Sequence, residues 1–407
     1  MRKLLLLLWL ALPLSVFSQG FQVNLEGEKQ IGMGHTGTGT LLDGASVFFN
    51  PGAVAMLPQN YIQAGISPLF FQSVFNPAGT SIQDHTVNKV APPFTFYAAV
   101  GPKSSFWKLG LGIYTPFGGL TDWGNNWQGK YALESLNLKA IYFQPTLSIR
   151  LADFVSIGGG FVYNRGSVDL TQALPLANSA GQDGQAELKG TGHGYGWNAG
   201  IFFKTQSGTT VGITHRSGVS TTISSGDAIF TVPPSLQSSF PQPNTFSSTI
   251  PLPATNSVGV GIHPSVNWTL AFDVNLVSWN VYKDLAFDYK TNTPNLPDSY
   301  FPRNYNDAFS FRGGAQYKSS PRTAWRFGGG YATTAVADGY VTPEAPDANR
   351  IYFTGGFGYL LAKHLDLDAS FEFEHLLSST QTNIQSQLSG TFETNVYIPG
   401  ISLSYHW

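Results

Sequence analysis

Apolar and polar residues alternate along much of this chain, which is the pattern of β-strands. Between residues 365 and 374 every second position is apolar or small, at Leu365, Leu367, Ala369, Phe371 and Phe373, and the positions between are polar, at Asp366, Asp368, Ser370, Glu372 and Glu374. Residues 309–318 and 270–276 alternate in the same way. Because successive side chains of a strand point to opposite faces, each strand has one apolar and one polar face.

The end of the chain separates a membrane barrel from a soluble β-sandwich, which would alternate too. Beyond residue 18 no apolar run is long enough to cross a membrane as a helix. The last strand gathers its large side chains on one face, at Tyr397, Pro399, Ile401, Leu403, Tyr405 and Trp407. This ending resembles that of outer-membrane barrels, where the assembly machinery recognises it. We therefore predict an all-β, transmembrane antiparallel barrel in a Gram-negative outer membrane, surrounded by lipid and lipopolysaccharide.

Turn signals divide residues 60–407 into about fourteen strands. We expect them near 60–72, 90–101, 106–118, 133–151, 153–171, 188–205, 209–231, 249–264, 266–290, 304–318, 322–334, 347–362, 364–378 and 393–407. Short connections, at 102–105, 152, 206–208, 265, 319–321 and 363, alternate with long polar loops such as 233–243. Short periplasmic turns and long outer loops are typical of membrane barrels, and an even count puts both ends on the periplasmic side.

Composition agrees with a lipid-facing wall. Of the 407 residues 11% are charged, against about 25% in an ordinary protein, and 14% are aromatic. Such a wall needs few charges and many rings. The net charge of −2 leaves no basic surface for nucleic acid. Cysteine is absent, so an exported fold must hold without disulfides, which barrel closure allows.

The first 18 residues have the pattern of a secretory signal peptide. Arg2 and Lys3 precede an apolar run over 4–14, and Val16 and Ser18 occupy the −3 and −1 positions of a cleavage site before Gln19. A membrane anchor is the alternative, but the run is too short to span a bilayer.

Residues 19–59 differ from the predicted barrel, residues 60–407. They are rich in glycine and do not alternate cleanly, so we expect them to fold into the lumen as a plug, or hatch. Residues 32–37 spell GxGxxG. A dinucleotide site would need a preceding strand, a following helix and a later acidic residue, none of which is convincing. A turn that brings backbone close to the barrel wall is the simpler interpretation.

Several motifs, in order, resemble the FadL family of fatty-acid and hydrocarbon transporters. They comprise residues 20–24, 32–34, Asp43, 49–52, 133–138, 196–201, 278–279 and 347–353. The resemblance covers the mature chain. It implies a fourteen-stranded barrel with an N-terminal hatch, in which a hydrophobic ligand is caught outside, held in an inner pocket and released sideways through a gap in the wall. A greasy ligand that moves from pocket to lipid need not cross water.

The resemblance assigns hatch roles to Phe21, Asn50, Pro51 and Gly52. Phe21 matches a phenylalanine that reaches the ligand pocket, although a buried anchor is the alternative. Asn50 and Pro51 match the family's Asn-Pro-Ala turn, although an ordinary Asn-Pro turn would look the same. Gly52 departs from the family pattern, and we expect it to make the turn more mobile.

The same resemblance places a lateral opening at the third strand. Pro116 removes a backbone donor, and Gly118 and Gly119 weaken the strand, so a break is expected there. Gly200 should lie beside the gap, where the lack of a side chain leaves passage. The alternative is that Pro116 simply ends the strand.

Contacts to the ligand are less well defined. Arg165, Arg303 and Arg312 are candidates for binding a carboxylate, and alternation points Arg312 to the lumen. Salt bridges within the wall are the alternative for such residues, and a neutral hydrocarbon ligand stays open. Trp123, Trp127 and Tyr131 predict a loop that exposes rings outside the cell and captures ligand, unless they belong to the interfacial aromatic girdle.

The sequence thus predicts an outer-membrane transporter of hydrophobic small molecules, most simply long-chain fatty acids. No nucleophile motif or HExxH is present, and the histidines lack metal-ligand spacing, so we predict no enzyme, no metal site and no cofactor. Two alternatives stay open. One is a plugged barrel that acts as a protein-secretion shuttle or structural protein, and the other is a general porin.

Overall fold

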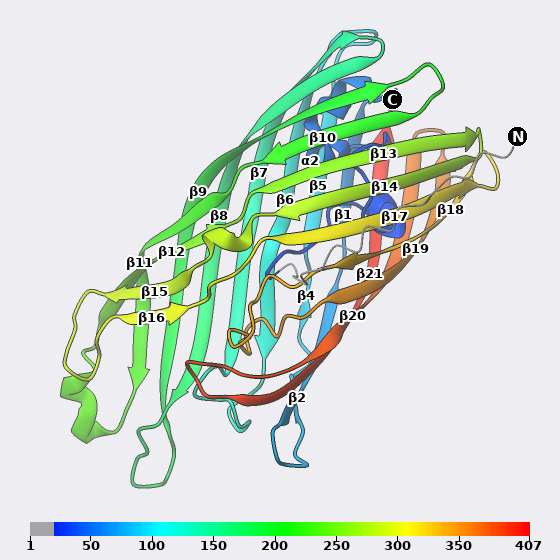
Figure 1. Ribbon diagram of the computed structural model, residues 1–407. Helices are drawn as coiled ribbons and strands as arrows, with labels where there is room; N and C mark the ends of the chain where they lie inside the picture. The colour runs from blue at the N-terminus through cyan, green and yellow to red at the C-terminus, as the bar shows by residue number, and fades with distance from the viewer. Residues whose placement is uncertain (1–19) are drawn as a thin grey trace, which may run out of the picture.

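The alternating stretches form a closed antiparallel wall of fourteen crossing strands, as expected (Figure 1). The computed structural model describes residues 20–407, so the predicted signal peptide, residues 1–18, lies outside the described part of the chain. The wall closes where the first strand meets the last. Tyr61 to Ile66 pair with His406 to Ile401 on one side and with Ala99 to Phe94 on the other.

Bends divide several crossing strands into two segments. The strand segments are β1 Tyr61–Ile66, β2 Leu69–Pro77, β3 Asp84–His85, β4 Val90–Ala91, β5 Phe94–Val100, β6 Trp107–Asp122, β7 Ser135–Ala152, β8 Val155–Leu174, β9 Gly184–Lys204, β10 Thr210–Arg216, β11 Val219–Thr231, β12 Asn244–Leu252, β13 Thr255–Ser265, β14 Trp268–Val277, β15 Asp284–Tyr289, β16 Ser299–Pro302, β17 Ala308–Lys318, β18 Thr323–Ala332, β19 Arg350–Ala362, β20 Leu365–Thr382 and β21 Ser389–His406. β10 and β11, for example, form one crossing strand beside β9, and the pairing is interrupted by an irregularity between Thr222 and Asp227.

The helices are short, and three of them precede the first strand. They are α1 Glu28–Gly32, α2 Ser46–Phe49, η1 Pro51–Met56, η2 Pro234–Ser239 and η3 Trp279–Val281. Within residues 20–407 no helix has both the length and the apolar character needed to span a membrane.

The alternation predicts which side chains face inward. On β20, Asp368, Ser370 and Glu372 are buried, whereas Phe371 between them is half exposed on the outer face. The short turns also lie where the sequence places them. The third crossing strand, β6, is longer than expected, because it continues past Gly118 to Asp122. Residues 209–231 and 266–290 are each divided, the second by η3.

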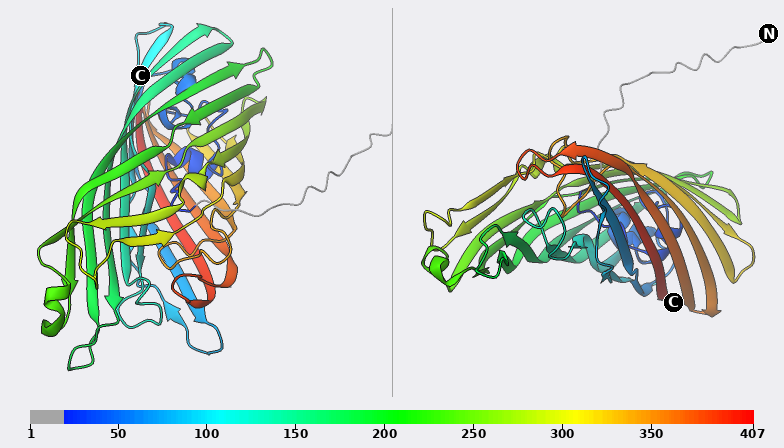
Figure 2. Two further views of the ribbon diagram at one scale, coloured as in Figure 1. Left: turned by 60° about the vertical axis from the view of Figure 1, so that its left-hand side comes forward. Right: turned by 90° about the horizontal axis from the view of Figure 1, so that it is seen from below.

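The N-terminal segment, residues 20–59, lies within the ring of strands (Figure 2). Its helix α1 contacts β18 to β21, and its helix η1 contacts β6 to β10 on a different arc of the wall. Residues that contact both arcs must lie inside the ring. Nearly all side chains from Leu25 to Ala55 are buried.

Candidate functional site

Strand β6 carries a bulge at Thr115 and Pro116. Its ladder with β7 shifts register between Tyr114 and Phe117, then continues to Asp122. A proline has no N–H to donate, so a bulge is one of the few places where a strand accepts it. The alternative that Pro116 ends the strand is therefore wrong. On the other side of β6, the ladder with β5 reaches only from Leu109 to Ile113.

The N-terminal segment pairs with the part of β6 that β5 leaves unpaired. The Val23 N–H donates to the Pro116 carbonyl at 2.9 Å, and the Gly118 N–H donates to the Phe21 carbonyl at 3.0 Å. Between them Gln22 forms an antiparallel bridge with Phe117. The wall beside β6 thus depends on three residues that precede the barrel in sequence.

A cavity of about 530 Å³, the wall cavity, adjoins this pairing. Its inner lining is largely apolar and includes Phe21, Val23, Leu25, Leu138, Leu376, Val396 and Ile398. It also reaches residues of the outer face, among them Phe94 and Ile141. Pro116 supplies the bulge, and Gly118 and Gly119 line the cavity. The cavity therefore extends from the lumen into the wall beside β6.

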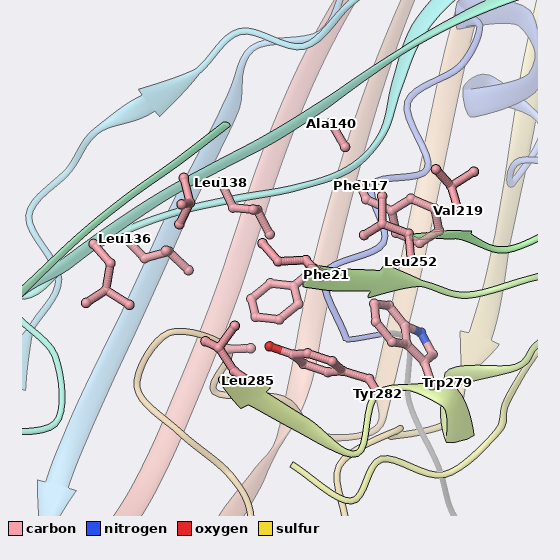
Figure 3. Packing of buried hydrophobic residues seen from close by; sticks show 14 of the residues in the cluster. Phe21, Phe117, Leu136, Leu138, Ala140, Val219, Leu252, Trp279, Tyr282 and Leu285 are labelled. Atoms are coloured by element: carbon pink, nitrogen blue, oxygen red, sulfur yellow. The ribbon is translucent and has the colours of Figure 1, made fainter. Parts of the chain in front are cut away.

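Phe21 forms one side of the wall cavity and is 8% exposed. Figure 3 shows its ring above Trp279 and Tyr282, with centroid distances of 6.4 and 6.3 Å in edge-on geometry. Its ring also lies beside Gly119, at which an added Cβ would be 3.4 Å from Phe21 Cδ1. The described contacts fit both interpretations of Phe21, because the ring is anchored and lines the cavity.

Asn50, Pro51 and Gly52 form a tight turn against β8 and β9. The Asn50 side chain accepts from the Gly52 N–H at 2.9 Å and donates to the carbonyls of Thr38 and Ile201 at 3.0 and 3.1 Å. Pro51 begins η1. The turn is therefore held on both sides by specific hydrogen bonds.

A Cβ on Gly52 would meet the Gly200 backbone, so this glycine permits close packing of the turn against β9. The expected position of Gly200 is wrong. Gly200 contacts Asn50 and Pro51 and does not line the wall cavity. It lies on β9, separated from β6 by β7 and β8, and so it is not beside the wall cavity.

Glycines on both partners let the N-terminal segment approach the wall backbone to backbone. An added Cβ on Gly314 would overlap the Met33 carbonyl, and one on Gly328 would overlap Gly34. Gly34 and His35 both have positive φ, at 65° and 63°. The GxGxxG stretch is therefore a turn packed on the wall, as the simpler interpretation predicted.

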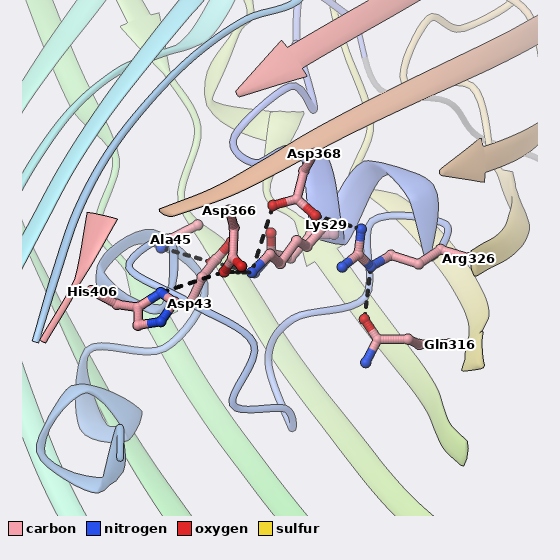
Figure 4. Close-up of polar contacts among 9 residues, drawn as sticks. Lys29, Asp43, Ala45, Gln316, Arg326, Asp366, Asp368 and His406 are labelled. Carbon is pink, nitrogen blue, oxygen red and sulfur yellow. Dashed lines mark hydrogen bonds and ion pairs between the residues drawn. The ribbon is translucent and has the colours of Figure 1, made fainter. Parts of the chain in front are cut away.

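Ion pairs connect α1 to the wall. Lys29 Nζ is 3.2 Å from Asp366 and 3.6 Å from Asp368, and Arg326 bonds Asp368 at 2.7 Å (Figure 4). In the same segment burial raises the pKa of Glu26 to about 8 and that of Glu28 to about 7. Alternation along residues 365–374 predicts that the two aspartates lie on the polar face, but it does not identify Lys29 as their partner.

The three arginines considered as ligand contacts lie in three different environments. Arg312 faces inward as expected, and it bonds the Asn24 side chain at 2.9 Å and Ser310 at 3.1 Å. Arg303 is buried in an ion pair with Glu344. Arg165 is exposed on the outer face of β8, so a lumenal role for it is wrong. Its parity with Phe161 and Tyr163 was the signal that could have placed it there.

The prediction that a capture loop exposes three aromatic rings is also wrong for two of them, Trp123 and Trp127. Trp123 and Trp127 are each 3% exposed and stack on one another at 4.6 Å. Their ring N–H groups donate to the carbonyls of Pro343 and Leu133. Tyr131 is exposed and bonds Asp183. The tryptophans thus hold the loop to the body of the barrel.

Four charged residues of the wall cavity had no role in the sequence analysis. Asp347 and Arg350 bond at 2.8 Å, Arg350 bonds Glu374 at 2.5 Å, and Glu344 pairs with Arg303. Alternation along β20 identifies Glu374 as inward-facing. Asp347 and Arg350 are only three residues apart, whereas Glu374 and Arg303 are distant in sequence from the residues they pair with, so no local pattern identifies those two partners.

Comparison with known proteins identifies a family with this architecture. Residues 10–407 match the model of a family described as outer membrane protein transport protein (OMPP1/FadL/TodX). The long-chain fatty acid transport protein of Salmonella typhi is 24% identical over 391 residues, with 88% of each chain covered. Its counterpart from Escherichia coli K12 is 23% identical over 406 residues, again with 88% of each chain covered.

Two solved structures show the same fold. A FadL homologue from Pseudomonas aeruginosa superposes with a TM-score of 0.82 at 18% identity, covering 95% of this chain and 99% of that one. The toluene transporter TodX from Pseudomonas putida superposes with a TM-score of 0.72 at 15% identity, covering 93% of this chain and 97% of that one.

Proposed function

The chain belongs to the OMPP1/FadL/TodX family of outer-membrane transport proteins, and on this premise we propose that it releases hydrophobic molecules sideways into the membrane. It is an outer-membrane β-barrel of a family that transports hydrophobic compounds such as fatty acids or aromatic hydrocarbons. Its relatives are transport proteins by name, in agreement with the prediction of no enzyme.

The wall cavity is the observation that carries this proposal. It has apolar walls, a volume of about 530 Å³ within the range of small-molecule sites, and lining residues on both faces of the barrel. A hydrophobic molecule that passes from such a cavity directly into lipid avoids the free-energy cost of exposing its apolar surface to water. The bulge at Pro116 and the small residues Gly118 and Gly119 provide the place where it leaves.

The N-terminal segment serves as the plug and gate in this proposal. Its polar side chains bind the lumenal face of the wall, and its residues 21–23 complete the edge of β6. A ligand can open the gate only if it binds the open arrangement more tightly than the closed one. Phe21 is the residue whose displacement would widen the cavity, and the turn at Asn50 and Pro51 anchors the segment behind it.

The remaining alternatives have weaker support. A general porin needs an open polar lumen, whereas here the lumen contains the N-terminal segment. No contact described above favours a protein-secretion shuttle. The partners expected in the envelope, which are lipid, lipopolysaccharide and the barrel-assembly machinery, stay predictions.

A single side chain can test the lateral route. Gly119→Phe places a ring in the wall cavity beside Phe21, where the backbone is free of positive φ and a Cβ has ordinary contacts. We expect uptake of labelled hexadecane by expressing cells to fall about tenfold, as when a binding site is filled. The variant should still show the heat-modifiable gel migration of a folded barrel.

Gly355→Phe is the matched control, because a Cβ at Gly355 meets nothing within 4 Å and its neighbours Phe353 and Phe371 face outward. Uptake by this variant should equal that of the parent. Normal uptake by folded Gly119→Phe protein would contradict release through this opening.

A further inference from the structure

The charged side chains that line the wall cavity are mostly acidic. Four carboxylates line it, from Glu344, Asp347, Glu372 and Glu374, against one guanidinium, that of Arg350, and one ammonium, that of Lys139. Lys139 is exposed on the outer face of β7. The inner part of the cavity therefore has four carboxylates and a single cation among its lining residues.

The cations that could receive an anionic headgroup already bind protein carboxylates. Arg350 bonds Asp347 at 2.8 Å and Glu374 at 2.5 Å, and its side chain is 11% exposed. Arg303 lies behind Glu344 and pairs with it, and its side chain is 6% exposed. An entering carboxylate would have to displace one of these bonds.

His35 and Arg312 do not change this balance. His35 Nε2 lies 2.9 Å from the Glu372 carboxylate, so His35 already has a carboxylate partner within the protein. Arg312 uses its guanidinium to bond Ser310 and Asn24. An ionised carboxylate that entered would therefore lose its hydration and meet like charges, whereas an uncharged ligand avoids both costs.

We propose that the wall cavity binds uncharged hydrophobic molecules, such as hydrocarbons and alkyl alcohols, and discriminates against ionised carboxylates. This inference rests on the proposed function, because it names the class of molecule that the same cavity carries. A hydroxyl group is compatible with the site, since the carboxylates accept hydrogen bonds and cannot donate them when ionised.

Three probes of equal chain length separate the possibilities. Full-length protein in lipid nanodiscs is titrated at pH 7.5 with 1-dodecanol, dodecanoate or dodecyltrimethylammonium, with empty nanodiscs as the reference for partitioning. We expect 1-dodecanol to bind at least about tenfold more tightly than dodecanoate. Equal or tighter binding of dodecanoate would overturn the inference, and so would tightest binding of the ammonium. Binding of none of the probes would overturn the proposed function, and this inference with it.

Glu344→Gln tests the cause of the discrimination. Without the Glu344 charge, Arg303 becomes available to an anion, so dodecanoate should bind about tenfold more tightly while 1-dodecanol is unaffected. Glu187→Gln, at a partly exposed position on β9, is the matched control and should change neither affinity. If Glu344→Gln does not give a folded barrel, Glu374→Gln provides the same test through Arg350. Unchanged dodecanoate affinity in a folded variant would reject the account.

Discussion

The two larger cavities that adjoin the N-terminal segment differ in chemistry more than in size. The wall cavity measures about 530 Å³ and is largely apolar on its inner side. A second cavity of about 790 Å³, the mouth cavity, lies at the end of the barrel where the short turns are. Its charged lining residues are Lys29, Lys318, Arg322, Arg326, Asp366 and Asp368. The larger cavity is therefore the less suitable one for a hydrophobic ligand.

The difference follows from which part of the N-terminal segment contributes to each cavity. Residues 20–25 line the wall cavity, and Lys29 of α1 lines the mouth cavity. Polar contacts at α1 hold the segment in place, so apolar surface at residues 21–25 is left for a ligand. We therefore expect changes at the mouth cavity to alter stability and permeability, and changes at the wall cavity to alter ligand binding.

The largest effect should follow from forcing the segment away from the wall. Gly314→Leu places a side chain where the Met33 carbonyl lies, so the segment cannot dock on β17. Ion conductance of the reconstituted protein should rise about tenfold or more, as expected when a barrel lumen opens to water. Gly313→Leu is the neighbouring control, because a Cβ there meets nothing within 4 Å. Equal conductance of the two folded variants would mean that the segment does not close the lumen.

Removal of the Lys29 charge should destabilise the protein without affecting ligand binding. Lys29→Met keeps the length of the side chain but leaves Asp366 and Asp368 short of one cation. Breaking a buried ion pair costs about 3 kcal/mol or more, which guanidinium-induced unfolding in lipid vesicles would measure. Lys189→Met removes two solvent-accessible ion pairs, with Asp169 and Glu187, and should have no measurable effect. Loss of 1-dodecanol affinity in Lys29→Met would contradict the assignment of stability to the mouth cavity and of ligand binding to the wall cavity.

The smallest effect should come from the ring in the wall cavity. Phe21→Ala removes apolar surface worth roughly 1.5–3 kcal/mol when fully buried, part of which contacts the ligand. Binding of 1-dodecanol should weaken about tenfold while ion conductance stays low, because the ion pairs of α1 remain. Phe353→Ala, which changes a ring on the outer face, should bind normally. Raised conductance in Phe21→Ala would show that Phe21 holds the segment rather than the ligand.

The local sequence pattern was sufficient to predict the strands of the barrel wall and the orientation of some residues of the site. Alternation along residues 365–374 determines which side chains of β20 face the lumen, because a strand repeats every two residues. The same rule placed Arg312 inward, and it would have placed Arg165 outward. The glycines of residues 32–37 likewise predicted a close approach of the backbone to the wall, since only glycine leaves room for it.

The partners of the site residues were decided by the tertiary structure. Gly200 is a glycine because η1 packs against it, and nothing near Gly200 in the sequence identifies Asn50 as its neighbour. Trp123 and Trp127 have the composition of an exposed loop, yet their N–H groups find buried carbonyls in the folded barrel. Arg303 is neutralised by Glu344, 41 residues further along the chain. The sequence by itself determined a barrel of about fourteen strands and the faces of those strands, because these depend on residues close in the chain. The position of the wall cavity's inner edge and the charge of its lining residues depend on contacts that form only when the barrel closes around the N-terminal segment.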